Sequence, residues 1–139
     1  MVSKRNKSYE VELKVPFHDL DPMQMVWHGN YFKYFDIART GLFDSLGVDL
    51  FSYFKKTNCL FPITKTTTKH IVSLQYRDKF KCKATIVEAR YKIVVEFQIR
   101  LIADNQICTN GRGEQVAVKH PEMEMMFEIP EEIRNALGA

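Results

Sequence analysis

The sequence contains few cysteines, glycines and prolines, and each shortage excludes a class of protein. Its 139 residues include 3 cysteines, 6 glycines and 5 prolines. The cysteines, Cys59, Cys82 and Cys108, lie far apart and form no CxxC pair, which excludes a zinc knuckle, a thioredoxin-type redox pair and a disulfide-dense mini-protein. The composition also excludes collagen and a disordered chain, because 45% of the residues are hydrophobic. We therefore expect one folded domain over residues 1–139.

Membrane-spanning and export signals are also missing from the sequence. No uncharged apolar run approaches the roughly 20 residues that a membrane-spanning helix needs. The N-terminus is basic, but no apolar segment follows it, which argues against a secretory signal. We therefore expect a cytoplasmic protein without a membrane span. Residues 1–8 are expected to form a flexible basic tail in which Lys4, Arg5 and Lys7 are solvated.

The charge of the chain is nearly balanced. Lys and Arg number 20 and Asp and Glu number 17, so the net charge is +3. A protein that binds nucleic acid through phosphate contacts is usually more basic, so we expect no nucleic-acid partner. A small anionic substrate suits this charge. The 4 histidines lack a metal-binding spacing such as HExxH, and we expect neither a metal nor a cofactor.

The periodicity of the sequence predicts an α+β fold. Residues 9–17 alternate between apolar and charged side chains, as in a half-buried strand. Residues 31–46 carry apolar side chains at helical spacing, with Asn30 as the expected N-cap and Gly47 just after the C-terminus. Four further strands are expected at residues 63–74, 80–90, 93–101 and 107–119, followed by a short terminal helix at 130–137.

This order of elements predicts an antiparallel sheet of about five strands packed on one long helix. Consecutive strands that are joined by short loops pair in an antiparallel manner. One helix covers only one face of such a sheet. The other face is either solvated or used for association, and the apolar content of the strands favours association between copies of the chain.

The irregular segment at residues 18–30 is the expected place for a site. It ends at a helix N-terminus, where free N–H groups and the helix dipole stabilise an oxyanion. Asp21 and His28 flank this point, and a carboxylate, an imidazole and helix-end amides suffice to hydrolyse an activated acyl group. The alternative is structural: Asp19 or Asp21 caps the turn before Pro22, and His28 is only hydrogen-bonded.

Residues 17–31, FHDLDPMQMVWHGNY, resemble the signature of hotdog-fold acyl-CoA thioesterases, the 4-hydroxybenzoyl-CoA thioesterase family in particular. The likeness continues along the helix and resumes more weakly at residues 62–63, 76–78 and 90–92. Two positions depart from the family pattern: Gln24 replaces the usual Gly, and Gly41 replaces an acidic residue that many members carry. These departures bear on substrate preference and leave Asp21 unchanged.

The resemblance implies a sheet wrapped round the long helix, homodimers or homotetramers, and an acyl-CoA substrate. By position, Asp21 matches the family's catalytic carboxylate, which acts as a nucleophile through a mixed anhydride or as a general base for water. His28 matches a His or Tyr close to the thioester. The amides near Asn30 and Tyr31, where the helix opens, would polarise the thioester oxygen.

The resemblance also implies where the rest of the substrate binds. Arg90 and Lys92 match basic positions that contact CoA phosphates in part of the family, although an ordinary solvated pair is the alternative. Aromatic residues that could line an acyl pocket, or simply belong to the core, are Trp27, Phe35 and Phe61.

The predicted function is therefore hydrolysis of an acyl-CoA or acyl-carrier thioester to a free acid and a thiol. Two other functions stay open. A hotdog dehydratase or isomerase is disfavoured because its His-containing hydratase motif is not apparent. A catalytically silent protein that only binds acyl thioesters is disfavoured by the presence of both Asp21 and His28.

Overall fold

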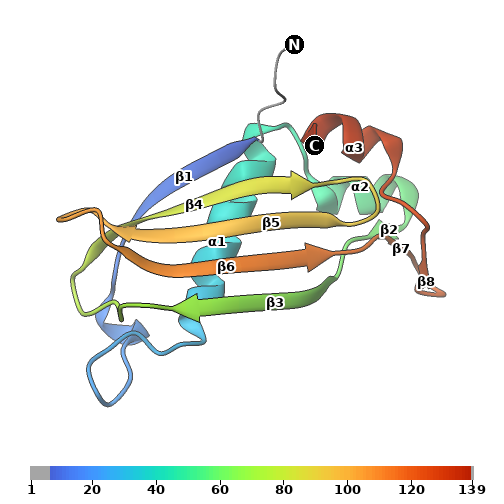
Figure 1. Cartoon of the computed structure of the whole chain (residues 1–139). Coiled ribbons are helices and arrows are strands. Elements are labelled where there is room, and N and C mark those ends of the chain that lie inside the picture. Colours follow the sequence, from blue (N-terminus) through green and yellow to red (C-terminus); the bar gives the residue numbers. More distant parts are fainter. Residues whose placement is uncertain (1–6, 139) are drawn as a thin grey trace, which may run out of the picture.

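A computed structural model describes residues 7–138, in which a five-stranded antiparallel sheet curves round one long helix (Figure 1). The prediction of a flexible tail over residues 1–8 is wrong for Ser8, because β1 begins there. The carbonyl of Lys7 accepts a hydrogen bond from the amide of Ile86 (2.8 Å), and its amine donates to the carbonyl of Ala136 (3.2 Å). These contacts fix Lys7 to the sheet and the C-terminal helix. The rest of the predicted tail, residues 1–6, lies outside the described residues.

The main sheet confirms the predicted fold class. Its strands follow the order β1-β4-β5-β6-β3, and every neighbouring pair is antiparallel. With the helix packed on one face, this is the hotdog arrangement. The strands are β1 (Ser8–Lys14), β3 (Ile63–His70), β4 (Lys79–Glu88), β5 (Ile93–Leu101) and β6 (Ile107–Gln115).

The long helix α1 (Asn30–Ser45) lies behind the sheet in Figure 1 and crosses it from the β3 edge to the β1 edge. It packs on the sheet through buried apolar side chains, among them Phe35, Ala38 and Leu42. The helix begins at Asn30, with Gly29 as its N-cap, so the prediction that Asn30 caps the helix is wrong. The side chain of Asn30 instead donates to the carbonyl of Asp19 (2.9 Å). Gly47 has φ +72°, as expected for the residue after a helix C-terminus.

Two glycines on β6 allow α1 to approach the sheet closely. A Cβ at Gly111 would lie 2.6 Å from the ring of Phe35, and a Cβ at Gly113 would lie 3.1 Å from Nη1 of Arg39. The ring of Phe35 stacks on that of Phe97 with centroids 4.5 Å apart. The glycines that interrupt the apolar pattern of β6 therefore mark the places where helix side chains meet the strand.

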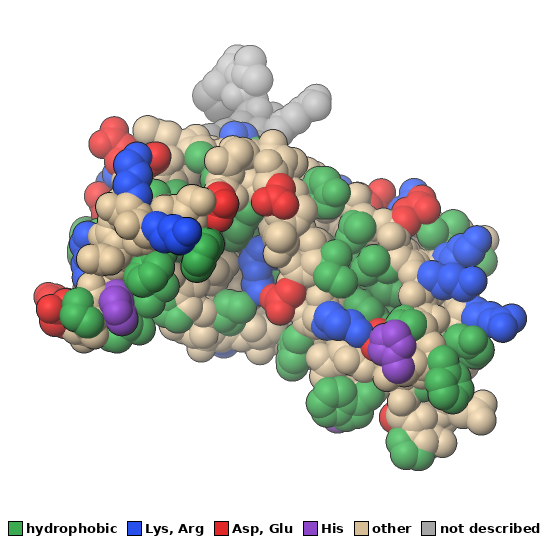
Figure 2. Space-filling model, turned by 180° about the vertical axis from the view of Figure 1, so that it is seen from behind, with side chains coloured by type: hydrophobic (Ala, Val, Ile, Leu, Met, Phe, Trp, Pro, Cys, Tyr) green, Lys and Arg blue, Asp and Glu red, His purple; other side chains and the backbone are tan. Residues whose placement is uncertain are grey.

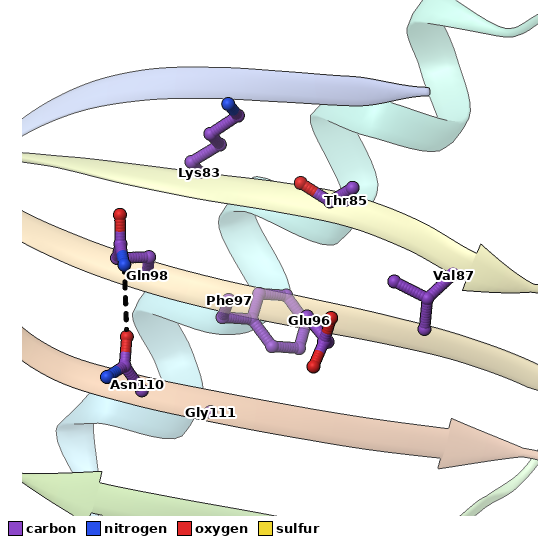
Figure 3. A pocket seen from close by; sticks show the side chains of 8 residues that line it. All are labelled: Lys83, Thr85, Val87, Glu96, Phe97, Gln98, Asn110 and Gly111. Carbon is purple, nitrogen blue, oxygen red and sulfur yellow. Dashed lines mark hydrogen bonds between the residues drawn. The ribbon is translucent and has the colours of Figure 1, made fainter. Parts of the chain in front are cut away.

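The face of the sheet away from α1 is polar. A shallow hollow of about 330 Å³ lies on this face, and Figure 3 shows the polar side chains of three neighbouring strands around it. In it, the amide of Gln98 donates to Asn110 (3.2 Å). Most apolar side chains of the strands are turned toward α1, while Val87 lines the hollow, so the apolar content of the strands gives little support to association through this face. The polar residues around the hollow are Lys83, Thr85, Glu96, Gln98 and Asn110.

The remaining elements lie at one end of the sheet. The sequence predicted the terminal helix α3 but neither the helix α2 nor the short strand β8, and it ran β6 and β7 together as one strand. Asp49 caps α2 by accepting hydrogen bonds from the amides of Phe51 and Ser52. These elements are α2 (Leu50–Thr57), β2 (Cys59–Leu60), β7 (Val118–Lys119), β8 (Glu124–Met125) and α3 (Glu131–Leu137), and β2, β7 and β8 form a second small sheet. In the part of the chain that the structure describes, no helix is both long and apolar enough to cross a membrane.

Candidate active site

The loop between β1 and α1 folds as a small hairpin beside the start of the helix. It opens with a 3-10 turn at Phe17–Asp19 and then reverses direction, with Leu20 bridged to Val26 and the amide of Asp21 bonded to the carbonyl of Met25 (2.7 Å). The amide of Val26 also donates to the carbonyl of Leu74 (2.9 Å). This hairpin keeps Asp21 at the same end of the molecule as the N-terminus of α1.

Asp19 is the buried anchor of this loop. Only 2% of Asp19 is exposed, and its carboxylate accepts hydrogen bonds from the Lys33 amine (2.5 Å) and the Tyr34 hydroxyl (2.6 Å). Burial opposes ionisation of the carboxyl, but these hydrogen bonds outweigh it and hold the pKa of Asp19 below its ordinary value. Burial and the neighbouring Asp19 both raise the pKa of Tyr34. Asp19 therefore anchors the loop to α1, whereas the turn before Pro22 is capped by Asp21.

Asp21 lies at the turn of the hairpin and is partly exposed. Its Oδ1 accepts hydrogen bonds from the amides of Met23 (2.8 Å) and Met25 (3.3 Å), which fixes the side chain against the turn. Among residues 7–138, no hydrogen-bond donor contacts its other oxygen, Oδ2. One carboxylate oxygen is therefore occupied by the turn while the other is open to a substrate or a water molecule.

The amides of Asn30 and Tyr31, which were expected to polarise the thioester oxygen, are hydrogen-bonded at the start of α1. The amide of Asn30 donates to the carbonyl of Trp27 (2.9 Å), and that of Tyr31 donates to the carbonyl of His28 (3.3 Å). Within the described part of the chain, the amides of His28 and Gly29 donate to no carbonyl or side chain. The free donors at the helix start are therefore the amides of His28 and Gly29, two residues before the predicted pair Asn30 and Tyr31. His28 itself is exposed, and its ring lies 5.2 Å from that of Trp27.

A second histidine lies beside the helix start. The ring of His70, the last residue of β3, is 4.5 Å from the ring of Tyr31, and its Nδ1 is 3.4 Å from the hydroxyl of Thr109. Burial and then the nearby His28 lower the pKa of His70. Tyr31 is buried, and its hydroxyl accepts the amide of Leu74 (3.0 Å). The sequence did not indicate His70, since its position depends on strand pairing.

An apolar cleft of about 210 Å³ runs between α1 and the β3 edge. Of the three aromatic residues predicted for an acyl pocket, only Phe35 lines it. Trp27 is exposed and covers Gly29, and Phe61 is buried beside Tyr53. The lining residues are Phe32, Phe35, Asp36, Arg39, Ile63, Thr66 and Phe97. Asp36 and Arg39 were not among the predicted site residues, although a charged pair at i, i+3 beside apolar positions is a signal that could have found them.

Within one chain, the predicted CoA-binding residues lie far from Asp21 and His28. Arg90 and Lys92 lie in the β4–β5 turn, at the end of the sheet where Ile93 and Ile63 both pair with Gln115. Ile63 is separated from His70, at the other end of β3, by ~23 Å at the usual rise of a strand. The Arg90 side chain is 62% exposed, 3.7 Å from Glu128, whereas the Lys92 amine is 2.9 Å from Glu114.

The surroundings of the loop are apolar. Figure 2 shows the side of the molecule that carries α1, with exposed hydrophobic side chains gathered over the loop at the lower right. The exposed fractions are 72% for Phe17 and Met23, and 45% for Tyr76. Residues 7–138 contain no cluster of three or more His, Cys, Asp or Glu side chains suited to hold a metal ion. The chemistry that this region offers is that of a carboxylate, imidazoles and free amides.

The chain is similar to known proteins over most of its length. A family model described as the thioesterase-like superfamily matches residues 15–137. A proposed esterase from Synechocystis is 24% identical over 133 residues, which cover 94% of this chain and 79% of that protein.

Solved structures share the fold at low sequence identity. A 1,4-dihydroxy-2-naphthoyl-CoA thioesterase from Synechocystis has a TM-score of 0.86 and 15% identity, covering 94% of this chain and 96% of that one. The 4-hydroxybenzoyl-CoA thioesterase from Pseudomonas sp. strain CBS-3 has a TM-score of 0.83 and 19% identity, with coverage of 94% and 99%. A DHNA-CoA thioesterase from Staphylococcus aureus has a TM-score of 0.79 and 22% identity, with coverage of 86% and 80%. At these identities the likeness concerns the fold.

Proposed function

Because this chain belongs to the thioesterase-like superfamily, we propose that it hydrolyses an acyl-CoA or acyl-carrier thioester to a free acid and a thiol. The observation that carries this proposal is the pairing of two features on one short loop. Asp21 keeps one carboxylate oxygen open, and the amides of His28 and Gly29 are free at the start of α1. A carboxylate and oxyanion donors together meet the needs of acyl transfer from a thioester.

The free amides are suited to hold the thioester oxygen. Negative charge develops on that oxygen when the carbonyl carbon is attacked. The amides of His28 and Gly29 lie just before the N-terminus of a 16-residue helix, whose dipole adds positive potential at this end. The imidazole of His28, which follows the hairpin, can orient the carbonyl or protonate the leaving thiolate. The oxyanion donors proposed here replace those expected at Asn30 and Tyr31.

Asp21 is suited to the attack, by either of two routes. As a nucleophile, Oδ2 bonds to the carbonyl carbon and the carbon–sulfur bond breaks, which gives a mixed anhydride and a thiolate; water then hydrolyses the anhydride to the acid and regenerates the carboxylate. As a general base, Asp21 takes a proton from the water that attacks, and the thiol leaves with a proton. In both routes the turn amides of Met23 and Met25 hold Oδ1 in place.

The open edge of β3 is suited to pair with a second copy of the chain. Seven of its eight residues are exposed, and three consecutive threonines favour an extended strand. Pairing of two β3 edges about a two-fold axis is antiparallel, so the His70 end of one chain meets the Ile63 end of its partner. The partner's β4–β5 turn, which carries Arg90 and Lys92, then lies on the same side as Asp21. A homodimer would thus combine the two halves of the predicted site.

Release of free thiol from a panel of acyl-CoAs tests the proposal. The wild-type protein should hydrolyse at least one thioester, and the Asp21→Asn variant should hydrolyse it far more slowly. Binding of acyl-CoAs without release of thiol would instead identify an acyl-thioester-binding protein. Equal turnover by the variant would remove Asp21 from the mechanism.

A further inference from the structure

His70 is a second imidazole near the candidate active site, and the proposed mechanism does not use it. It is the last residue of β3, and its ring lies 4.5 Å from the ring of Tyr31, in the first turn of α1. Tyr31 follows Gly29 by two residues, which is a rise of about 3 Å along the helix. The ring of His70 therefore lies beside the start of α1, where the free amides of His28 and Gly29 would hold the thioester oxygen.

The ring of His70 is fixed on one side. Its Nδ1 lies 3.4 Å from the hydroxyl of Thr109, which is fully buried and has no other side-chain hydrogen bond among the residues that the structure describes. The backbone just after the ring is fixed as well, because the amides of Ile71 and Val72 both donate to the carbonyl of Cys108 (2.7 and 3.1 Å). When the ring proton is on Nδ1, the hydroxyl of Thr109 accepts it.

The opposite side of the ring is open. His70 is exposed at the edge of the sheet, and within residues 7–138 its Nε2 has no hydrogen-bond partner. In the tautomer with the proton on Nδ1, Nε2 carries a lone pair and can accept a proton from water. Pairing of two β3 edges uses backbone groups and leaves the ring on the face of the sheet that packs on α1. One ring nitrogen is thus held in place while the other is available.

The surroundings of His70 favour the neutral imidazole that a base requires. Burial and then the neighbouring His28 lower the pKa of His70 from its ordinary value near 6.5, so the ring is neutral at pH 7. The other titratable groups beside it are Tyr31 on α1 and Cys108 on β6. Burial raises the pKa of both, and the charge of Asp78 adds to this effect, so neither group is charged at pH 7.

The nucleophilic route of the proposed function needs a base other than Asp21 in its second step, the hydrolysis of the mixed anhydride. After the Asp21 carboxylate has attacked the thioester, it is part of the anhydride and cannot take a proton from water. His28 is assigned to the carbonyl and the leaving thiolate, which belong to the first step. His70 is the imidazole beside the helix start that remains for the second step.

We infer that His70 is the general base of the second step, and that its Nε2 takes a proton from the water that attacks the acyl carbon of the anhydride. As the bond from this carbon to the water oxygen forms, its bond to the Asp21 oxygen breaks, which gives the free acid and the Asp21 carboxylate. His70 then passes its proton to the thiolate released in the first step. One thioester and one water thus give one acid and one thiol. This inference rests on the proposed function and deepens it, because it assigns Asp21 the nucleophilic route.

The test measures thiol release before the steady state in His70→Phe, which keeps an aromatic ring against Tyr31 but carries no nitrogen. The probe is a thioester that the wild type hydrolyses. In the variant Asp21 still attacks, but the second step is slowed. We therefore expect a rapid burst of about one thiol per site, and then a steady-state kcat ~100-fold below that of the wild type. Hydroxylamine should trap the anhydride as a hydroxamate of Asp21, which mass spectrometry detects.

Two further positions separate proton transfer from packing. In His70→Ala, free imidazole should raise the steady-state rate at least ~10-fold, because it can enter the vacated space and accept the proton; this variant also serves if His70→Phe does not fold. Thr109→Val loses the hydroxyl that holds Nδ1, and its kcat should fall ~10-fold, whereas Thr109→Ser should stay within about 2-fold of the wild type.

His120→Phe is the matched control. The ring of His120 also packs edge-on against an aromatic ring, that of Phe54 (5.6 Å), but at the end of the sheet away from the loop. Its burst and its steady-state rate should be those of the wild type.

A wild-type kcat in His70→Phe would overturn the inference, because packing alone would then explain the ring. A lowered kcat without a burst and without a hydroxamate of Asp21 would also overturn it and would assign Asp21 the general-base route. Failure of the proposed function gives a different result: the wild type itself releases no thiol from any thioester in the panel, which would overturn both.

Discussion

Asp19 and Asp21 are two residues apart in one loop, yet the structure assigns them opposite surroundings. Asp19 is buried, and both of its carboxylate oxygens are engaged, by Lys33 and by Tyr34. Asp21 is partly exposed, and within the described residues only one of its oxygens is engaged, by amides of its own turn. A carboxylate whose partners belong to the fold stabilises the fold. A carboxylate with an open oxygen on a fixed turn is available for chemistry.

The most direct test of the difference between Asp19 and Asp21 is to change Asp21. In Asp21→Asn the amide oxygen can still accept the hydrogen bonds of Met23 and Met25, so the turn is retained. We expect kcat for a hydrolysed thioester to fall at least ~100-fold, because the nucleophile or general base is lost. The free energy of unfolding should change by no more than ~0.5 kcal/mol. Thiol release and urea unfolding measure the two effects, and a large loss of stability would mean that Asp21 also supports the fold.

The converse change is made at Asp19. Asp19→Asn removes the charge that Lys33 and Tyr34 stabilise and leaves one of them poorly bonded. We expect the free energy of unfolding to fall by ~2 kcal/mol, as is usual for a lost hydrogen bond to a charged group. Measured at a temperature where the variant is folded, kcat should fall much less than in Asp21→Asn. A loss of kcat equal to that of Asp21→Asn, in a variant of unchanged stability, would contradict the assignment.

The pH dependence of stability distinguishes the same two residues. The pKa of Asp19 is lower in the folded chain than the ordinary value near 3.9 that it has when unfolded. Its contribution to stability is therefore present above that ordinary value and is lost as the pH falls through the folded pKa. The difference in unfolding free energy between the wild type and Asp19→Asn should be constant from pH 7 to pH 5 and shrink below ~pH 4. A difference that stays constant down to pH 2.5 would show that Asp19 is not stabilised as an anion.

The sequence predicted the parts of the molecule that depend on local pattern. The alternation of apolar and polar residues revealed the strand at 93–101, and apolar residues at helical spacing revealed α1, because each element packs one face on a common core. The helix α2 was missed although Asp49 is a recognisable N-cap, since eight residues show little periodicity. The irregular pattern of residues 18–30 placed Asp21 and His28 on one loop, and the resemblance supplied their expected roles.

What the sequence did not reveal depends on contacts between distant elements. Asp19 reaches Tyr34 across 15 positions, and Arg39 rests on Gly113 of another strand. No local pattern separates Asp19 from Asp21, because both are short acidic residues in a turn-rich segment. The free amides lie two residues before the predicted pair. The helix starts one residue earlier than predicted, which is within the usual uncertainty of a helix end, and a tight turn before it engages the amides of Asn30 and Tyr31.

Arg90 and Lys92 differ in a similar way, because one is paired more closely than the other. Smaller effects on catalysis are expected from changing them. The Lys92 amine is 2.9 Å from Glu114, whereas Arg90 is 62% exposed and 3.7 Å from Glu128. Arg90→Ala should therefore raise KM for a CoA thioester a few-fold, more at low salt than at high salt, and Lys92→Ala should raise it less. Steady-state kinetics at two ionic strengths measure both effects. An unchanged KM in Arg90→Ala would leave Arg90 as an ordinary surface charge.

Mixing subunits tests whether Asp21 and Arg90 of one site come from different chains. In a homodimer with antiparallel β3 edges, a heterodimer of Asp21→Asn and Arg90→Ala chains contains one site with both native residues and one site with neither. Refolding an equal mixture of the two variants should thus give a kcat/KM, at low salt and low substrate, above the mean of the two variants measured separately. If each site lay within one chain, the mixture would equal that mean. Activity above that mean would show that Arg90 of one copy and Asp21 of the other copy act in the same site, across the interface between the two copies.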